Sequence, residues 1–178
     1  MTTQRYQKIY AWFMAHPAAK TLLLAADTAV PLLLAVLYGI LLGRYGLQWY
    51  RAANFAGAAA TAAARGMFWR IVLIPAATLA GGTLLRNTLN CPRPYAQPGF
   101  LPLKTKEGDG CSLPSRHALS AGVIASVWVL TMPGTSFLAL VMMACVCVLR
   151  VLVGVHSIRD VVLGALLGFG CGLLILLP

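Results

Sequence analysis

Charged residues are scarce in this sequence, and acidic residues are the scarcest. Only 10% of the 178 residues are charged, against roughly 25% in soluble domains, while 60% are hydrophobic. The acidic residues are Asp27, Glu107, Asp109 and Asp160, against 14 lysines and arginines, and the net charge is +10. This composition excludes an ordinary soluble domain and predicts one membrane-embedded domain over residues 1–178.

Two further features are missing. No basic run interleaved with aromatic residues occurs outside the apolar segments, so we expect no nucleic-acid partner. The start, MTTQRYQKIYAWFMAHP, has neither an uninterrupted apolar stretch nor a small-residue cleavage site, so we expect no cleavable signal peptide. We interpret residues 1–17 as a helix lying in the membrane interface. The lysines and arginines then fix topology and contact the head groups of the lipid bilayer.

The five cysteines do not form a metal-binding pattern. Cys145 and Cys147 lie about 200° apart on a helix, which suits a metal poorly, and with Cys171 they are expected to be small core residues. Cys91 and Cys111 flank one polar stretch, and a disulfide between them is left open for the case that this stretch faces an oxidising compartment.

Apolar runs of about the length that crosses a bilayer predict an all-α, polytopic transmembrane bundle. Residues 51–66 are alanine-rich and only weakly hydrophobic. We interpret them as a helix at or near the membrane surface, with a sixth span as the alternative. The five expected spans are Thr21 to Gly43, Phe68 to Leu89, Ala118 to Met132, Phe137 to Val153, and Val161 to Leu177.

The charges between the spans predict the orientation. The 44–70 connection carries four arginines and no acid, so the positive-inside rule places it in the cytoplasm. Residues 86–117 and 150–160 then meet on the opposite, outer face, whether there are five spans or six. The long 92–114 loop is rich in proline and glycine and is expected to be irregular and functional.

Ionisable residues at span ends are costly and each suggests a function. Arginine is the preferred partner of phosphate oxygens, so this cluster predicts an anionic substrate group, most simply a phosphate. Any single arginine here, Arg86 or Arg159 for example, could instead be only a head-group anchor. The combined spacing of the arginines, the histidines and the aspartate favours a substrate-binding site. The shared outer face carries Arg86, Arg93, Arg116, His117, Arg150, His156, Arg159 and Asp160.

Two short stretches suggest catalytic groups. His156 and Asp160 are four residues apart and share a face if they lie in the first turn of a helix, where the carboxylate would fix the imidazole tautomer. Ser115 can cap the following helix and leave backbone N–H groups free for an anion. His117 lies in the first turn of that helix and is suited to protonate a leaving oxygen.

The residues resemble the signature motifs of the type 2 phosphatidic acid phosphatase (PAP2) superfamily, whose usual pattern is K-x6-R-P, P-S-G-H and S-R-x5-H-x3-D. Three positions depart from that pattern: Arg86 replaces the lysine, Arg116 the glycine and Leu149 the serine, and none removes a group that the mechanism requires. The matching segments, within 86–160, are Arg86-x6-Arg93-Pro94, Pro114-Ser115-Arg116-His117 and Arg150-x5-His156-x3-Asp160.

The resemblance implies a small bacterial inner-membrane phosphatase that needs no metal or other cofactor. His156 is the implied nucleophile, oriented by Asp160, and His117 the proton donor. The substrate would be a membrane lipid phosphate: polyprenyl diphosphate, phosphatidylglycerol phosphate or phosphatidate. The alternatives are a lipid-phosphate phosphotransferase, a haloperoxidase, and a non-catalytic lipid-binding or transport protein. The implied phosphate ligands are Arg86, Arg93, Ser115, Arg116 and Arg150. The sequence leaves oligomeric state open.

Overall fold

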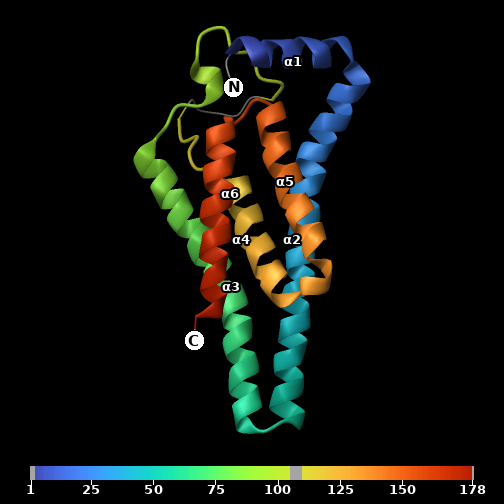
Figure 1. The fold of residues 1–178 in the computed structure, drawn as a ribbon, viewed down its shortest axis with the longest axis vertical. Coiled ribbons are helices and arrows are strands. Elements are labelled where there is room, and N and C mark those ends of the chain that lie inside the picture. The colour runs from blue at the N-terminus through green and yellow to red at the C-terminus, as the bar shows by residue number, and fades with distance from the viewer. Residues whose placement is uncertain (1–2, 105–109, 178) are drawn as a thin grey trace.

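The computed structural model describes residues 3–104 and 110–177, and this part of the chain is a helical bundle without strands (Figure 1). Glu107 and Asp109 lie outside the described residues. The α-helices are α1 (Thr3–Ala15), α2 (Pro17–Phe55), α3 (Ala58–Leu89), α4 (Arg116–Thr131), α5 (Ser136–Leu152) and α6 (Ile158–Gly172); the short 3-10 turns are η1 (Pro94–Ala96), η2 (Pro133–Thr135) and η3 (Leu173–Leu176).

The all-α membrane bundle predicted from the sequence is confirmed. Within the described residues, four helical stretches are long and apolar enough to cross a membrane: 17–55, 58–96, 133–152 and 158–176. The remaining expected span, Ala118 to Met132, corresponds to α4, which has 16 residues. Most of its side chains are buried among the other helices, so it is the centre of the bundle rather than a lipid-facing helix.

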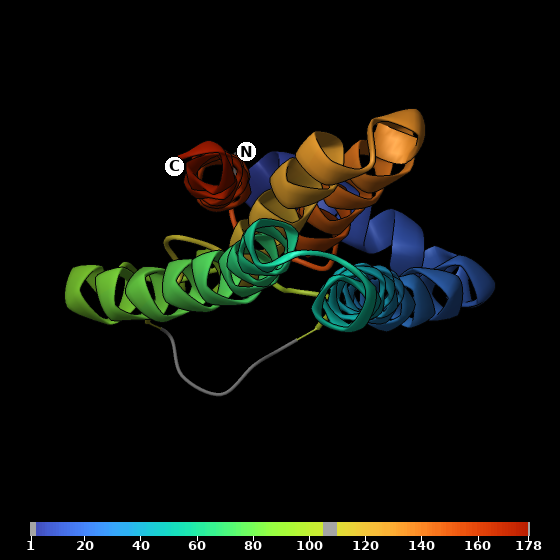
Figure 2. The same ribbon diagram turned by 90° about the horizontal axis from the view of Figure 1, so that it is seen from below.

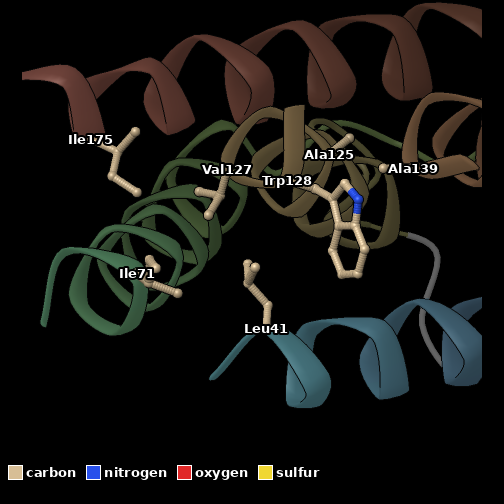
Figure 3. Packing of buried hydrophobic residues seen from close by; sticks show 7 residues of the cluster. All are labelled: Leu41, Ile71, Ala125, Val127, Trp128, Ala139 and Ile175. Carbon is tan, nitrogen blue, oxygen red and sulfur yellow. The ribbon is translucent and has the colours of Figure 1, made fainter. Parts of the chain in front are cut away.

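The bundle has two layers, seen end-on in Figure 2. One layer contains α2 and α3, which diverge from their connecting turn, and the other contains α4, α5 and α6. The layers are joined by a buried hydrophobic cluster (Figure 3), in which Leu41 and Ile71 of the first layer face Trp128 of the second. The Trp128 indole N–H donates to Thr135 Oγ1 at 2.9 Å, which satisfies its polar atom within the core.

The prediction of a separate surface helix, or a sixth span, over residues 51–66 is wrong. The stretch is instead the tip of one helical hairpin, because α2 continues to Phe55, the chain reverses at Ala56 and Gly57, and α3 begins at Ala58. Alanine favours helix on both sides of the reversal. At about 1.5 Å per residue, the 39-residue α2 is nearly twice as long as the roughly 30 Å hydrocarbon core. The hairpin therefore projects past the ends of α4–α6 (Figure 1).

The N-terminal helix lies across one end of the bundle, as expected for an interfacial helix (Figure 1). Tyr6 fastens α1 to that end: its hydroxyl donates to Leu152 O at 3.1 Å and accepts from the Leu103 N–H at 3.3 Å. Its ring stacks on Phe100 with the centroids 4.3 Å apart. Burial raises the pKa of Tyr6 to about 12, so the hydroxyl stays protonated and keeps its donor role. Gly154 leaves room for this hydroxyl, because a Cβ at that position would clash with it, and its φ of +82° also favours glycine.

The closest helix packing is between α4 and α6. A Cβ on Gly168 of α6 would clash with the backbone carbonyl of Leu119, and one on Gly122 of α4 would clash with the carbonyl of Ala165. Gly164, one turn before Gly168, faces Ser115 O, which its Cβ would approach to 2.8 Å. Small residues spaced by four let helices in lipid approach until their backbones touch. This contact sets the position of the first turn of α4 against the first turn of α6.

We predict that Gly168→Ala destabilises the protein in detergent by about 1–3 kcal/mol, because the added methyl must push α4 away from α6. The measurement is thermal unfolding followed by circular dichroism. Gly170→Ala is the matched control, since nothing lies within 4 Å of a Cβ at that position on the same helix, and it should be neutral or mildly stabilising. Equal effects of the two substitutions would contradict the close-packing interpretation.

Candidate active site

The polar residues that the sequence analysis singled out meet at the end of the bundle that carries α1. The α3 and α5 helices end there, and α4 and α6 begin there. The two starting helices are joined directly, because the Ser115 N–H donates to Asp160 O at 3.1 Å. Residues 86–104, 110–117 and 150–160 therefore share one end of the molecule, as predicted.

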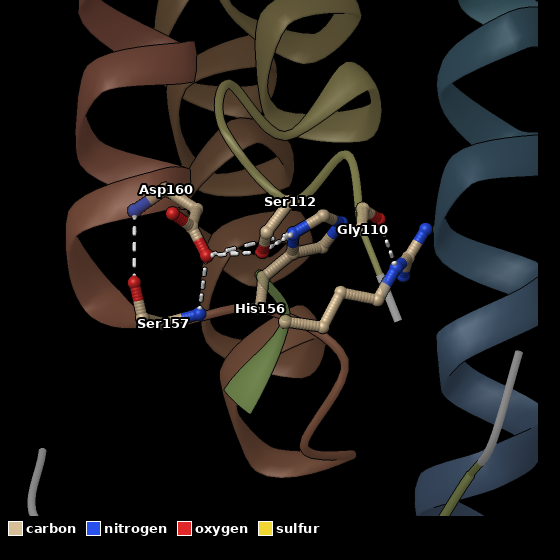
Figure 4. A network of polar contacts seen from close by, with 6 residues as sticks. Gly110, Ser112, His156, Ser157 and Asp160 are labelled. Atoms are coloured by element: carbon tan, nitrogen blue, oxygen red, sulfur yellow. Dashed lines mark hydrogen bonds and ion pairs between the residues drawn. The ribbon is translucent and has the colours of Figure 1, made fainter. Parts of the chain in front are cut away.

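At the centre lies a hydrogen-bonded group of His156, Asp160 and Ser112 (Figure 4). His156 Nδ1 lies 3.8 Å from Asp160 Oδ2, within ion-pair range but too long for a hydrogen bond. Ser112 connects the two: its hydroxyl donates to Asp160 Oδ2 at 2.7 Å and lies 3.3 Å from His156 Nδ1. Ser112 is fully buried. The arrangement holds Nδ1 toward the carboxylate and leaves Nε2 as the free ring nitrogen.

Asp160 also begins its own helix. Its Oδ2 accepts the Ser157 N–H at 2.7 Å, and its own N–H donates to Ser157 Oγ at 3.3 Å, a reciprocal capping box. The condition under which the two residues were expected to share a face, a common first helical turn, is not met for His156, because Ser157 is the cap and the helix begins at Ile158. His156 lies in the preceding turn, and its side chain nevertheless faces the carboxylate four residues on.

His156 is nearly completely buried, with 4% of its surface exposed. This burial is the largest influence on the ring and lowers its pKa below the ordinary value of 6.5. Asp160 acts in the opposite direction, and the charges of Arg93 and Arg86 lower the pKa further. The net effect keeps the imidazole neutral near pH 7, the state that a nucleophile needs.

Arg86 and Arg93 are both buried beside this histidine. Arg93 Nε donates to Gly110 O at 3.1 Å, and its guanidinium lies 5.8 Å from the centre of the Tyr95 ring. Its Nη1 is buried and has no hydrogen-bond partner within the described residues. Buried donors are normally paired, so a free guanidinium N–H at this point suits an anionic ligand.

Ser115 occupies the N-cap position of α4, as predicted, but its side chain makes no capping hydrogen bond. Its Oγ is buried and is another polar atom left without a partner in the part of the chain that the structure describes. The first backbone N–H groups of α4 and this hydroxyl are thus both available to an anion at the helix N-terminus.

Arg150 is engaged elsewhere in the site. Its Nη2 lies 3.0 Å from Asp27 Oδ1 and donates to Asp27 O at 3.1 Å. Lys104 approaches the same buried carboxylate, with Nζ 2.8 Å from Oδ2. Asp27 therefore links α2 to α5 and to the 92–114 loop, and it offsets the charge of Arg150. Arg150 borders the site through this pair, whereas Arg86 and Arg93 carry the charges that act on His156.

A long apolar groove runs from this end of the bundle between the two layers. Its volume is about 700 Å³, and residues from α2, α3, α4 and α5 line it. Arg116, His117 and Ser120 line it with Thr83, which lies three residues before Arg86 on α3. The remaining lining residues are Pro31, Leu34, Ala35, Tyr38, Leu42, Val72, Pro75, Ala76, Leu79, Val123, Ile124 and Val146.

Two residues of the site were missed from the sequence. Asp27 carried a signal, since a lone carboxylate within an apolar span is costly and needs a partner. Ser112 carried none, because a serine three residues before Ser115 is unremarkable without the fold. The disulfide left open between Cys91 and Cys111 is absent, and both thiols are free. Among residues 3–104 and 110–177, no group of three or more His, Cys, Asp or Glu side chains could hold a metal ion.

Among the described residues, a helical bundle with four apolar spans carries a buried, arginine-flanked His–Asp pair at one end. Together with the family match, these features define a membrane lipid phosphatase. The chain belongs to the PAP2 superfamily, whose model matches residues 67–177, more than half of the sequence. The match includes all three motifs described above.

The solved structures that are similar include the following two. Aquifex aeolicus LpxE shares 20% identity at a TM-score of 0.57, covering 90% of this chain and 87% of LpxE, which supports a common fold. The first transmembrane PAP2 type phosphatidylglycerolphosphate phosphatase from Bacillus subtilis shares 23% identity at a TM-score of 0.46, covering 96% of this chain and 93% of that one. No curated protein matches the sequence.

We predict that Ser112→Ala lowers kcat roughly 10- to 100-fold with little change in KM, because His156 loses its link to the carboxylate. Steady-state phosphate release in detergent measures both constants. Ser126→Ala is the control, since Ser126 is equally buried on α4 and its Oγ has no partner within the described residues. A change confined to KM, or the same loss in both variants, would contradict a positioning role for Ser112.

The second prediction from this site concerns the protonation of His156. Histidine ¹⁵N NMR of the detergent-solubilised protein should show this ring titrating below pH 6.5, because its burial disfavours the imidazolium. The resonance is assigned by its loss in His156→Ala. Arg93→Gln should move the titration to higher pH, since a neighbouring positive charge is removed. A midpoint above 6.5 in the native protein would contradict the buried, neutral state.

Proposed function

We propose that this protein hydrolyses a phosphate or diphosphate group from a membrane lipid through a phosphohistidine intermediate. The observation that carries the proposal is the buried His156–Ser112–Asp160 group beside two buried arginines. Its orientation leaves Nε2 of a neutral imidazole free to attack phosphorus. Family membership supports the same chemistry.

The neighbouring residues supply the remaining roles. Arg86, Arg93 and Ser115 bind the phosphoryl oxygens as charge redistributes, and Arg150 borders this site from its pair with Asp27. His117, in the first turn of α4, donates a proton to the leaving oxygen. Phosphoryl transfer depends mainly on positioning and on electrostatic stabilisation, which fixed arginines and a helix N-terminus provide. Water then hydrolyses the phosphohistidine, and no metal is required in this scheme.

The apolar groove supports a lipid as the substrate. A groove of about 700 Å³ lined by aliphatic side chains of the membrane helices can hold an acyl or prenyl chain while the phosphate remains at head-group height. The candidate substrates are polyprenyl diphosphate, phosphatidylglycerol phosphate and phosphatidate. We place the protein in the bacterial inner membrane with this site on the outer face, because the 44–70 hairpin at the other end is rich in arginine.

His156→Ala should reduce phosphate release at least 1,000-fold, because no nucleophile remains, while native activity should persist in EDTA. The assay is orthophosphate release in detergent from the three lipid phosphates, with unfolding temperature as the folding control. Full activity in the variant would overturn the nucleophile assignment. Loss of native activity in EDTA would overturn the metal-free scheme, and release that depends on an added acceptor would favour the phosphotransferase alternative.

A further inference from the structure

We propose that Arg116 binds the phosphate on the leaving-group side of the scissile bond, so that the preferred substrate is a lipid diphosphate; this inference rests on the proposed function. Arg116 differs from the other arginines of the site in being exposed and in lining the apolar groove. Within the described chain it has no hydrogen-bond or ion-pair partner, so its charge is available to a ligand.

Arg116 lies near enough to Arg86 for the two charges to act on each other, but it differs from Arg86 and Arg93 in being exposed. Arg86 and Arg93 are buried and their charges act on His156, so they hold the phosphoryl group that is transferred. Arg116 begins α4 at the end of the groove, next to His117. A lipid with its chain in the groove and its terminal phosphorus at His156 must place its leaving oxygen, and the atoms attached to that oxygen, between these two places.

The chemistry of the leaving group then discriminates between substrates. The leaving group of phosphatidate is an alcohol that His117 protonates as it departs, so little charge remains on it for a cation to stabilise. The leaving group of a lipid diphosphate is a lipid monophosphate, whose charge increases as the bond breaks. A guanidinium beside it stabilises that charge in the transition state, where the effect on rate is greatest. A cation with no internal partner at the groove end is therefore selective for diphosphates.

The reaction balances with the groups present. His156 Nε2 forms a bond to the terminal phosphorus, and the bond from that phosphorus to the bridging oxygen breaks. The lipid monophosphate leaves with the electron pair, and His117 supplies a proton to it. Water then attacks the phosphohistidine, the phosphorus–nitrogen bond breaks, and orthophosphate is released while His117 recovers the proton from water.

The test compares Arg116→Gly with the native protein on farnesyl diphosphate and farnesyl monophosphate, which differ only in the second phosphate. We expect kcat/KM for the diphosphate to fall at least tenfold more than kcat/KM for the monophosphate. Arg116→Lys should recover part of the diphosphate rate. Arg159→Gly is the matched control, since Arg159 is also an exposed arginine in the first turn of a helix, and its diphosphate preference should match the native value.

Equal losses on the two farnesyl substrates, or no loss, would overturn the inference. Phosphatidylglycerol phosphate is a third arm, because its second phosphate lies beyond a glycerol spacer. A larger loss on this lipid than on the diphosphate would also overturn the inference, by assigning Arg116 to a separate head-group phosphate. His156→Ala in the same assay tests the proposed function independently: activity there would overturn the mechanism, whatever the Arg116 variants show.

Discussion

The contact between α4 and α6 is the constraint on which the site depends. The start of each helix carries part of the candidate site: Ser115 to His117 at the start of α4, and Asp160 in the first turn of α6. Glycines at the contact let the two backbones meet. In lipid there is no hydrophobic force to press helices together, so association relies on this close van der Waals packing. The Ser115 N–H donates to Asp160 O at the point where both helices begin. A shift of one helix against the other would therefore move Ser115 relative to Asp160.

The second requirement is to keep many positive charges together near lipid. Two solutions are visible in the described residues. Arg150 is paired with the buried carboxylate of Asp27 and so has its charge offset within the fold. Arg86 and Arg93 are buried with no carboxylate partner among residues 3–104 and 110–177, which is costly unless an anion occupies the space between them. The fold thus concentrates its unbalanced charge at the candidate site, and it balances the neighbouring charge of Arg150 with Asp27.

Much of this arrangement could be predicted from the sequence. The scarcity of charge predicted the membrane bundle, and the alternation of apolar runs with polar stretches predicted which stretches share an end. What could not be predicted depended on long-range contacts. Ser112 joins His156 to Asp160 only because a loop 44 residues away in sequence folds onto the turn before α6, and no periodicity encodes this. The 51–66 stretch was misinterpreted because helix propensity indicates helix but not where a helix reverses; two residues, Ala56 and Gly57, decided that.

The attachment of α1 by Tyr6 has a consequence for the order in which the molecule assembles. One hydroxyl joins residue 6 to residue 152 and to the loop at residue 103, so the buried tyrosine of α1 finds its partners only after the chain as far as residue 152 is in place. Until then α1 can only rest on the membrane surface through its own amphipathic side. The turn that carries His156 follows residue 152 directly, so the end of the bundle that holds the candidate site is complete only when these distant parts of the chain have met.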